Sequence, residues 1–314
     1  MWNSVVSIII PTFNRAQLIA ETLDSIILQT HRDWECIVID DHSSDTTKEV
    51  VKSYCEKDVR IKYFHLPAGK NTGANSARNY GLHQSKGDYI IWFDSDDLMT
   101  PGHIEGKLKK IQNRNLDFVV ARTQNFRGEE MLTPYTYEKK EYGIKAADFI
   151  LLKIHWYTYD VMLKRKVAEK ISWNEKMKSW QDYNYFCKML LVTENGAYLD
   201  EILTHRRLHS NSIQTALTKD VVSFKQELLD NRIFTFQDIQ EQIGHKTRSE
   251  LIFGMMNLCY ELRKLNSFPE KIKQVKDIVR RNLGLISLIL FQSSIVSAWV
   301  LKRGFFLLEK AKRR

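Results

Sequence analysis

Cysteine is scarce in this sequence and follows no ligand-binding spacing. Four cysteines occur among the 314 residues, namely Cys36, Cys55, Cys187 and Cys259. None belongs to a CxxC pair or a Cys/His cluster, so the spacing indicates neither a disulfide framework nor a zinc site. A reducing compartment fits this pattern best.

Signals for export, repeats and nucleic-acid binding are also missing. The first apolar run, Val5 to Ile10, is much too short for a signal peptide and ends in a polar Pro-Thr-Phe-Asn turn. The chain has no internal repeat and no low-complexity linker. The sequence shows no zinc-finger spacing, no helix-turn-helix and no interleaving of aromatic and basic residues. It therefore does not favour a nucleic-acid binder. At 43% hydrophobic, the chain can bury a substantial core.

Positive charge is concentrated near the end of the sequence. Residues 1–259 contain 34 Lys and Arg against 34 Asp and Glu, whereas residues 260–314 contain 13 against 4. The whole formal net charge of +9 therefore lies in the C-terminal part. Such a basic region either attracts anionic lipid head groups or nucleic acid, or is simply a solvated helix face.

Strands and helices alternate through the first hundred residues. Short apolar runs rich in β-branched residues indicate buried strands, and each is followed by a segment with helical periodicity. The expected strands are 5–10, 34–39, 61–66 and 89–93, and the expected helices are 17–29, 46–56 and 71–84. This alternation predicts an α/β fold with a doubly wound, mostly parallel sheet flanked by helices.

The pattern is less regular beyond residue 115. We expect strands at 117–123, 159–163, 197–203 and 204–208, a loop or hairpin at 126–143, and a helix at 182–192. Near residue 218 the composition changes from mixed to mainly helical and then basic. The sequence therefore predicts a first domain over residues 1–217 and a helical, basic C-terminal extension over residues 218–314.

One long stretch of the extension carries no charge. Leu283 to Leu301 is 19 residues long and is flanked by basic pairs on both sides. As a helix it would be about 28 Å long, which is marginal for spanning a bilayer. Three interpretations stay open: a helix on or partly in a membrane surface, a helix packed on the domain or a partner, and a true span. Small residues on one face, Ser287, Ser294 and Ala298, suit close helix contact in each case.

Polar clusters follow three of the expected strands. They are Pro11 to Asn14, Asp40 to Asp45, and Asp94 to Asp97. Because ligands bind outside the carboxyl ends of the strands in doubly wound sheets, we expect the three clusters to share one pocket.

Asp94-Ser95-Asp96-Asp97 places three carboxylates within four residues. Clustered carboxylates repel one another unless a cation joins them. A Mg²⁺ or Mn²⁺ ion would relieve this repulsion by bridging one or two carboxylates to the phosphates of a substrate. The alternative is that the cluster only caps the turn before Pro101.

Asp41 lies one residue beyond an expected buried strand. Its carboxylate can accept a hydrogen bond from a uracil-type N–H group, and helix capping is the structural alternative. Asp45 or Ser44 is better placed to cap the next helix, which leaves Asp40 and Asp41 available for other contacts.

The segment from Asn71 to Gly81 opens a helix with small residues. A backbone of this kind can approach a diphosphate closely at the helix N-terminus. Arg78 in the same segment can offer its guanidinium group to the phosphates.

Together these segments resemble the inverting glycosyltransferases of family 2, which have the GT-A type nucleotide-binding fold. The segment 7–15 is similar to the family's opening strand and turn, 37–45 to its base-binding segment, and 93–97 to its DxD motif. The resemblance covers residues 5 to about 215. It implies that Pro11, Phe13 and Asp41 line the nucleotide base. It also implies that Asp94 and Ser95 approach the ribose and phosphate and that Asp96 holds the metal.

The resemblance implies an acidic catalytic base at the start of a later helix. In the matching segment, Trp180-Gln181-Asp182-Tyr183, Asp182 keeps the base position, whereas Gln181 replaces the family's usual Glu. A simple helix N-cap is the structural alternative for Asp182. His209 resembles a later family histidine that reaches the metal or diphosphate, with a structural role as its alternative.

We therefore expect a metal-dependent inverting glycosyltransferase. It would move a sugar from a nucleotide-diphosphate donor, with a UDP-sugar as the expected donor, to a hydroxyl of a glycan or lipid-linked glycan acceptor in cell-surface polysaccharide synthesis. The expected cofactor is Mn²⁺ or Mg²⁺. The missing export signal, together with the place where nucleotide sugars are made, predicts a cytoplasmic protein. The basic, partly apolar C-terminal region predicts a peripheral position on the inner face of the plasma membrane. Homo-oligomers are compatible with the sequence, and nucleic acid is not an expected partner.

A second hypothesis is a catalytically inactive nucleotide-sugar-binding or assembly protein. The main support for this alternative is Gln181 in place of the family's usual Glu. A nucleotidylyltransferase would share the doubly wound sheet, but it would present a Gly-rich opening segment where this chain has Pro-Thr-Phe-Asn.

Overall fold

The computed structural model describes residues 4–69, 71–134, 143–208 and 220–312. The chain divides into two compact units. The first comprises Met1–Lys145 and Ile154–His209, and the second comprises Ala146–Lys153 and Ser210–Arg314. The expected boundary between residues 217 and 218 lies outside the described residues. The sequence pattern gave no sign that the short segment Ala146–Lys153 belongs with the C-terminal helices.

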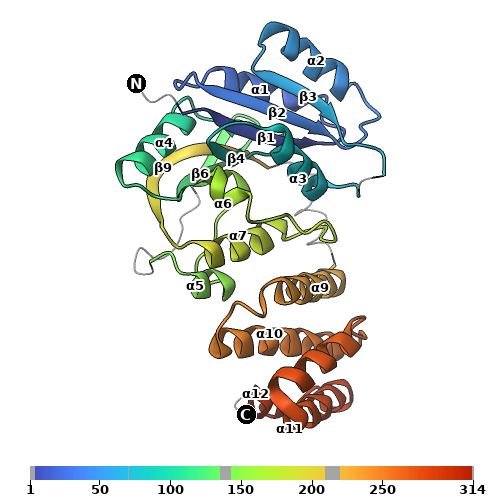
Figure 1. Cartoon of the computed structure of the whole chain (residues 1–314). Helices are drawn as coiled ribbons and strands as arrows, with labels where there is room; N and C mark the ends of the chain where they lie inside the picture. The colour runs from blue at the N-terminus through green and yellow to red at the C-terminus, as the bar shows by residue number, and fades with distance from the viewer. Residues whose placement is uncertain (1–3, 70, 135–142, 209–219, 313–314) are drawn as a thin grey trace. The chain divides into compact units, whose positions relative to one another are not determined.

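A mixed sheet forms the centre of the first unit (Figure 1). Within the described residues its strand order is β3-β2-β1-β4-β8-β6-β9-β5, and β7 pairs with β6. The strands are β1 Val6–Thr12, β2 Trp34–Asp40, β3 Ile61–His65, β4 Tyr89–Trp92, β5 Leu98–Met99, β6 Phe118–Arg127, β7 Glu130–Pro134, β8 Val161–Lys164 and β9 Gly196–Arg207.

The first four strands are parallel to one another, as the alternation of strands and helices predicted. Beyond them, β8 runs antiparallel between β4 and β6, while β6 and β9 pair in parallel. The two short strands expected at 197–203 and 204–208 are one continuous strand, β9. The expected loop or hairpin at 126–143 begins as a hairpin of β6 and β7, and its residues 135–142 lie outside the described part.

Helices cover both faces of the sheet (Figure 1). Apolar residues of α1, α2 and α4 share one core with Val6, Ile8 and Ile10 of β1, whereas α3 packs on the opposite face. The helices of this unit are α1 Ile19–Ile27, α2 Thr47–Lys57, α3 Ala74–Gln84, α4 His103–Asn113, α6 Arg165–Ala168 and α7 Gln181–Val192, with a 3-10 helix, η1, at Thr158–Asp160. Helix α4 was not predicted from the sequence.

The register of the parallel strands brings their polar ends to one edge of the sheet. Thr12 at the end of β1 pairs with Asp40 at the end of β2, and Asp40 pairs with His65 of β3. On the other side of β1, Ile9 pairs with Trp92, the last residue of β4. The turns that follow β1, β2 and β4 therefore leave the sheet side by side, as expected for a doubly wound fold.

The second unit is helical, as expected for the C-terminal region. The helices are α5 Ala146–Ile150, α9 Val221–Ile239, α10 His245–Lys264, α11 Ile272–Leu301 and α12 Phe305–Lys312. The carboxylate of Asp220 caps α9 by accepting hydrogen bonds from the backbone N–H groups of Val222 and Ser223. Among the described helices, α11 alone is long and apolar enough to cross a membrane, with a mean hydropathy of 1.9 in a window that is 28% buried.

The uncharged stretch lies in the second half of α11, but it does not form an unbroken helix. Gly284 has φ 85° and ψ 178°, which places a kink at its start. This conformation is accessible to glycine and strained for other residues. Ser287, Ser294 and Ala298 are fully buried, as expected for a small-residue face in close contact with other helices.

We predict that Gly81→Val destabilises the first unit. A Cβ atom at Gly81 would overlap Ile9 Cγ2 and lie 3.2 Å from Ile39 Cγ1, so α3 would have to move away from the sheet. Overpacking of this kind costs about 1–3 kcal/mol of unfolding free energy, which urea denaturation would measure. Gly143→Val is the matched control, because an added Cβ there meets nothing within 4 Å. Equal stability of the two variants would contradict the close packing of α3.

Candidate active site

The turns that follow β1 and β2 are joined by hydrogen bonds. Asn14, with a positive φ of 50°, donates its backbone N–H to Ser43 Oγ at 2.9 Å and accepts the Ser44 N–H on its side-chain oxygen at 2.8 Å. The backbone N–H of Arg15 donates to Thr47 Oγ1 at 2.8 Å. These contacts fix one wall of the strand-end region.

The Asp40 side chain stabilises this wall through hydrogen bonds within the protein. Its side chain is fully buried and accepts hydrogen bonds from the Ser43 N–H at 2.9 Å and from the Tyr63 hydroxyl at 2.5 Å. The expectation that Asp40 is available for other contacts was therefore wrong. Asp45 accepts the backbone N–H of Thr47 at 3.0 Å, but the N-cap of α2 is Thr46 and neither Asp45 nor Ser44.

Asp41 has one satisfied and one unsatisfied carboxylate oxygen. Its Oδ2 accepts the backbone N–H of Gly73 at 2.6 Å, just before α3. Its Oδ1 is buried and has no hydrogen-bond partner among the described residues. A buried acceptor left without a donor costs about 1–3 kcal/mol, so this atom marks a place where a ligand N–H would fit. Pro11 is buried at the end of β1, whereas the Phe13 ring is 52% exposed.

The turn after β4 gathers positively charged partners around its three carboxylates. Asp94 Oδ1 lies 2.8 Å from Arg78 Nη2, and Asp96 Oδ2 lies 3.5 Å from Arg15 Nε. Asp97 is buried and accepts the backbone N–H of Arg207 at 2.8 Å. Each carboxylate therefore meets a donor from a different element, which reduces their mutual repulsion.

Two of these carboxyl groups have raised pKa values in the folded chain. Burial raises the pKa of Asp94, and the neighbouring Arg78 opposes this effect. Burial together with the charges of Asp96 and Asp94 raises the pKa of Asp97 well above its ordinary value. Carboxyl groups with pKa values perturbed by burial and by one another occur often at functional sites. Ser95 is buried within the same turn.

Arg78 joins the turn after β4 to the start of α7. Besides Asp94, its guanidinium group donates to Gln181 Oε1 at 3.0 Å and lies 4.5 Å from the centre of the Trp173 ring. The side chain of Arg78 is only 6% exposed. Gln181 therefore has a defined role in this chain, since its neutral oxygen accepts from Arg78 without adding a third carboxylate beside Asp94 and Asp182.

Asp182 lies in the first turn of α7 and is not its N-cap. The N-cap is Trp180, which has a positive φ of 52°, and the Asp182 carboxylate accepts a hydrogen bond from the neighbouring Tyr183 N–H at 2.8 Å. Burial raises the pKa of Asp182, and Arg78 lowers it while Asp94 raises it. The electrostatic coupling to Arg78 and Asp94 places Asp182 at the same site as the turn after β4.

Arg206 lines this site and was not predicted from the sequence. Arg206 of β9 has its guanidinium group 5.0 Å from the ring centre of Tyr157, and its charge lowers the pKa of Asp94 and Asp97 against the larger effect of burial. The sequence feature that could have identified Arg206 is its position three residues before His209, a predicted site residue. His209 itself lies outside the described residues.

The tryptophans near the site have separate roles. Trp156 and Trp173 are buried, and Trp173 stacks on Tyr185 with ring centres 4.2 Å apart, so both belong to the core. Trp180 and Tyr157 are half-buried and line the surface near Asp182. Of these four aromatic residues, Trp180 and Tyr157 are the two that are accessible for stacking on a sugar ring.

A buried charged network lies under the turn after β4. Lys107 of α4 donates to His103 Nε2 and to the Tyr159 backbone oxygen, both at 2.8 Å. His103 Nδ1 donates to the Leu203 backbone oxygen at 2.8 Å, which leaves Nε2 as the acceptor for Lys107. The ring of Phe93, the residue before Asp94, packs edge-on against His103.

Asp160 supplies the negative charge of this network. Its carboxylate accepts hydrogen bonds from Thr123 Oγ1 at 2.5 Å and from the Tyr157 N–H at 2.7 Å. Burial lowers the pKa of Lys107 to about 7, and the charge of Asp160 acts in the opposite direction. The network ties α4, β9, β6 and η1 together beneath the elements that carry Asp94, Arg206 and Tyr157.

Among the described residues, no group of three or more His, Cys, Asp or Glu side chains is arranged to hold a metal ion. Mg²⁺ and Mn²⁺ sites that act on phosphates often use only one or two carboxylates, with water and the substrate as the other ligands. Asp96, with a side chain 20% exposed beside two further carboxylates, fits that kind of site.

The mixed sheet and its flanking helices define a fold of the GT-A type. The comparison with protein families agrees, because residues 7–172 match the model described as glycosyl transferase family 2. The chain is also 32% identical over 230 residues to an uncharacterized glycosyltransferase of Rickettsia typhi, with 69% of each chain covered. This protein therefore belongs to glycosyltransferase family 2.

Solved structures agree on the fold. S. aureus TarS 1-349 in complex with UDP-GlcNAc has a TM-score of 0.71 at 17% identity, covering 94% of this chain and 89% of that one. The Pyrobaculum calidifontis mannosyltransferase PcManGT, in complex with GDP-Man and Mn²⁺, has a TM-score of 0.58 at 13% identity, covering 100% and 86%. Several sequence relatives are much longer, and the match spans only 17% to 18% of their length.

We predict that Lys107 makes the stability of the protein depend on pH. The pKa of Lys107 is lowered from 10.5 to about 7 in the folded chain, so between these values the unfolded chain binds more protons. Linkage then makes the unfolding free energy increase as pH rises from about 7 to 10.5. Lys107→Met should flatten this increase in urea denaturation measured across the same pH range.

Lys109→Met is the matched control for this experiment. Lys109 lies on the same helix but is 55% exposed and pairs with Glu105 at 2.6 Å. Its replacement should leave the pH dependence as in the wild type. The same slope for both variants would show that Lys107 is not the titrating group.

Proposed function

We propose that this protein transfers a glycosyl group from a nucleotide-diphosphate sugar to an acceptor hydroxyl, with inversion at the anomeric carbon. The observation that carries the proposal is the electrostatic coupling of Asp182 on α7 to Asp94, which is in turn coupled to Asp96 in the turn after β4. Asp41 follows β2, a strand whose end lies at the same edge of the sheet. Family membership supports the reaction class. A UDP-sugar is the first donor to test.

The nucleotide base would lie between the turns that follow β1 and β2. Asp41 Oδ1 is a buried acceptor in need of a donor, which the N–H group of a uracil ring would supply. The exposed ring of Phe13 offers a surface on which the base can stack. Pro11 would close the other side of this base site. Ser95 and Asp94 would then lie toward the ribose and the diphosphate.

Asp182 would act as the general base. It would take the proton of the acceptor hydroxyl as that oxygen forms its bond to the anomeric carbon. The bond from this carbon to the diphosphate would break at the same time, and its electron pair would leave with the nucleotide. The raised pKa of Asp182 suits this role, because a base is most effective when its pKa lies closer to the working pH.

Positive charge would stabilise the departing diphosphate. Arg78 and Arg206 both act electrostatically on Asp94, so both lie where negative charge would develop. A Mn²⁺ or Mg²⁺ ion, held by Asp96 and by His209 from outside the described residues, would neutralise further phosphate charge when bound. The Mn²⁺ in the PcManGT structure supports a divalent cation here.

Asp182→Asn should remove transfer while leaving nucleotide binding intact. Loss of the base is expected to lower turnover on the order of 10²-fold or more, because the amide cannot accept the hydroxyl proton. Release of UDP during transfer and UDP affinity by calorimetry would measure the two effects separately. Asp200→Asn is the matched control, since Asp200 is 63% exposed and lies 2.9 Å from Arg122 on β6.

Two results would overturn this assignment. Full activity of Asp182→Asn would exclude Asp182 as the base. A wild-type protein that binds UDP-sugars with Mn²⁺ but neither transfers nor hydrolyses them would favour the inactive sugar-binding alternative.

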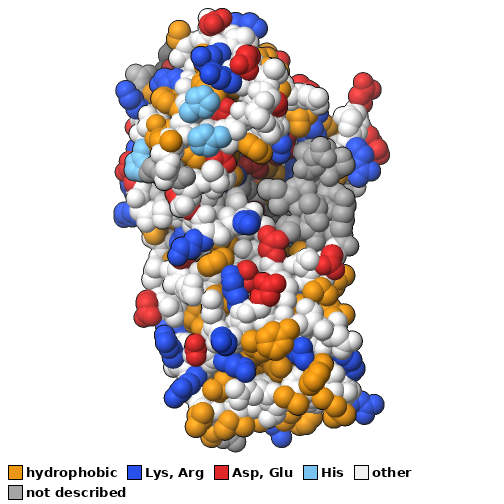
Figure 2. Space-filling model, turned by 90° about the vertical axis from the view of Figure 1, so that its right-hand side faces the viewer, with side chains coloured by type: hydrophobic (Ala, Val, Ile, Leu, Met, Phe, Trp, Pro, Cys, Tyr) orange, Lys and Arg blue, Asp and Glu red, His pale blue; other side chains and the backbone are white. Residues whose placement is uncertain are grey.

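The acceptor and its location form the finer part of the proposal. We propose a glycan or lipid-linked acceptor, reached by a protein that lies on the cytoplasmic face of the plasma membrane through its second unit. Large apolar side chains are exposed along the second half of α11 and on α12, namely Leu285, Ile286, Ile289, Val296, Trp299, Val300, Leu301, Phe305 and Phe306. Figure 2 shows orange side chains and blue basic groups at the surface of the lowest part of the view.

Exposed large apolar side chains concentrated on two neighbouring helices indicate a binding surface. Basic residues at both ends of the uncharged stretch, including Arg281 and Lys302, are also exposed, which favours anionic lipid as the occupant. The kink at Gly284 and the burial of Ser287 and Ser294 favour a helix lying on the membrane over one that spans it.

Ile289→Asp and Val296→Asp should abolish membrane binding. A charge placed in the apolar patch would have to be buried among acyl chains, which is costly. Sedimentation with vesicles of phosphatidylglycerol and phosphatidylethanolamine would measure the loss. Val59→Asp, at an 87% exposed valine of the first unit, is the matched control. Two results would contradict a lipid-binding patch. One is that the two α11 variants sediment with vesicles as the wild type does, and the other is that these substitutions convert a wild-type dimer to monomers.

A further inference from the structure

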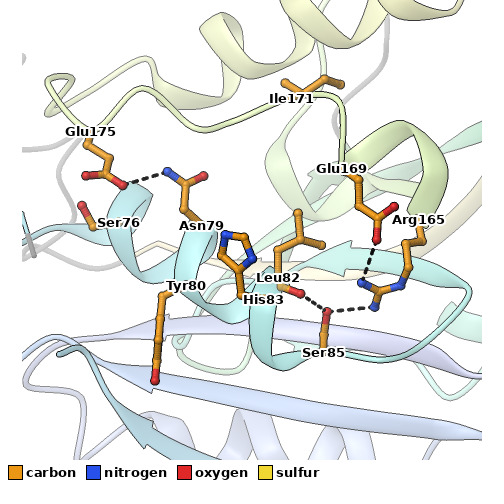
Figure 3. A pocket seen from close by; sticks show the side chains of 10 residues that line it. All are labelled: Ser76, Asn79, Tyr80, Leu82, His83, Ser85, Arg165, Glu169, Ile171 and Glu175. Atoms are coloured by element: carbon orange, nitrogen blue, oxygen red, sulfur yellow. Dashed lines mark hydrogen bonds and ion pairs between the residues drawn. The ribbon is translucent and has the colours of Figure 1, made fainter.

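A separate cavity lies on the outer side of α3, between this helix, α6 and the segment 169–175 (Figure 3). It has a volume of about 620 Å³. Its polar and aromatic lining comes from Ser76, Asn79, Tyr80, His83, Glu169 and Glu175. None of these residues belongs to the carboxylate cluster or to the base site described above.

Hydrogen bonds hold the polar walls of the cavity in place. Glu175 accepts from the Asn79 amide at 3.0 Å and from the Asn71 amide at 2.8 Å. At the other end, Arg165 donates to Ser85 Oγ at 2.9 Å and lies 3.6 Å from Glu169. Figure 3 shows Glu175 with Asn79 at one end of the lining. Arg165 lies at the other end with Ser85 and Glu169. The cavity is therefore a preformed shape and not a gap between loose side chains.

Ser76 contributes an unsatisfied hydroxyl to this lining. The residue is 2% exposed, and its Oγ is buried with no hydrogen-bond partner among the described residues. Buried hydroxyl groups are normally paired, because an unmade hydrogen bond costs about 1–3 kcal/mol. The orphaned hydroxyl thus points to a ligand that can donate or accept a hydrogen bond inside the cavity.

The charges of the lining select among ligand classes. The lining contains two carboxylates, Glu169 and Glu175, and one guanidinium group, that of Arg165. This guanidinium group already donates hydrogen bonds to Ser85 Oγ and to the Gly87 backbone oxygen. An anion is therefore disfavoured. Few aliphatic groups, such as Leu82 and Ile171, line the cavity, which disfavours a lipid chain. Carboxylate, amide, imidazole and hydroxyl groups beside a tyrosine ring suit a neutral polyol.

We propose that this cavity binds a neutral sugar ring of a glycan, at a site separate from the donor cleft. The proposal rests on the proposed function, which makes a glycan the acceptor or the product. The same Glu175 that lines the cavity also holds Asn71 at the start of the segment leading into α3. A sugar bound there would retain the glycan on the enzyme while transfer proceeds at Asp182.

Binding of neutral methyl glycosides tests the proposal directly. Methyl glycosides of glucose, galactose, mannose and N-acetylglucosamine would be titrated into the full chain with UDP and Mn²⁺ present, and binding would be followed by saturation-transfer NMR and calorimetry. At least one should bind with a Kd of about 1 mM or weaker, as expected for so small a ligand.

Variants locate the bound sugar. Ser76→Ala and His83→Ala should each weaken binding about 5- to 10-fold, the loss expected for one hydrogen bond. Gln84→Ala, on the same helix but outside the lining, should leave it unchanged. Transfer to a monosaccharide acceptor should be unaffected in His83→Ala, whereas extension of a longer glycan should slow.

Two outcomes would overturn the site. They are the absence of binding by every glycoside, and binding that neither Ser76→Ala nor His83→Ala weakens. Either result, obtained with a wild-type protein that still transfers sugar, would remove this cavity site and leave the proposed transferase activity in place.

Discussion

Repulsion among carboxylates at one edge of the sheet is the constraint on which the first unit depends. Three aspartates follow β4 within four residues, and Asp182 joins them from α7. The fold offsets this charge with donors from separate elements: Arg78 from α3, Arg15 from the turn after β1, and β9 through Arg206 and a backbone N–H. The same excess of negative charge that strains the folded chain makes this edge suitable for a cation and a diphosphate.

Burial connects the stability of the site to its chemistry. The pKa of Asp182 is raised because the carboxylate is removed from water, and this cost makes it a better proton acceptor. Beneath the site, Lys107 and Asp160 are fully buried and hold four elements through hydrogen bonds. Networks of this kind contribute little net stability, but each member is costly to leave unpaired, so they favour one arrangement of the surrounding backbone. The positions of Tyr157 and Arg206 follow from that arrangement.

Much of the fold could be predicted because it rests on local patterns. The strands at 5–10, 34–39, 61–66 and 89–93 match β1 to β4, and the polar clusters after them meet at one edge as expected. The role of Asp40 was predicted wrongly, because its neighbour Tyr63 lies 23 residues further along the chain and only strand pairing brings them together. Helix α4 was not predicted, and the strand expected at 159–163 matches β8, but its antiparallel place between β4 and β6 depends on distant contacts that periodicity does not reveal.

The sequence alone determined the alternation of strands and helices, the turn residues at the strand ends and the family to which they belong. These features depend on neighbours within a few residues, where spacing and residue type are sufficient. Only the tertiary structure decided which carboxylates are buried, which arginine serves each, and that Gln181 binds Arg78. The reason is physical: desolvation and charge pairing depend on which side chains the completed fold places within a few ångströms, whatever their separation along the chain.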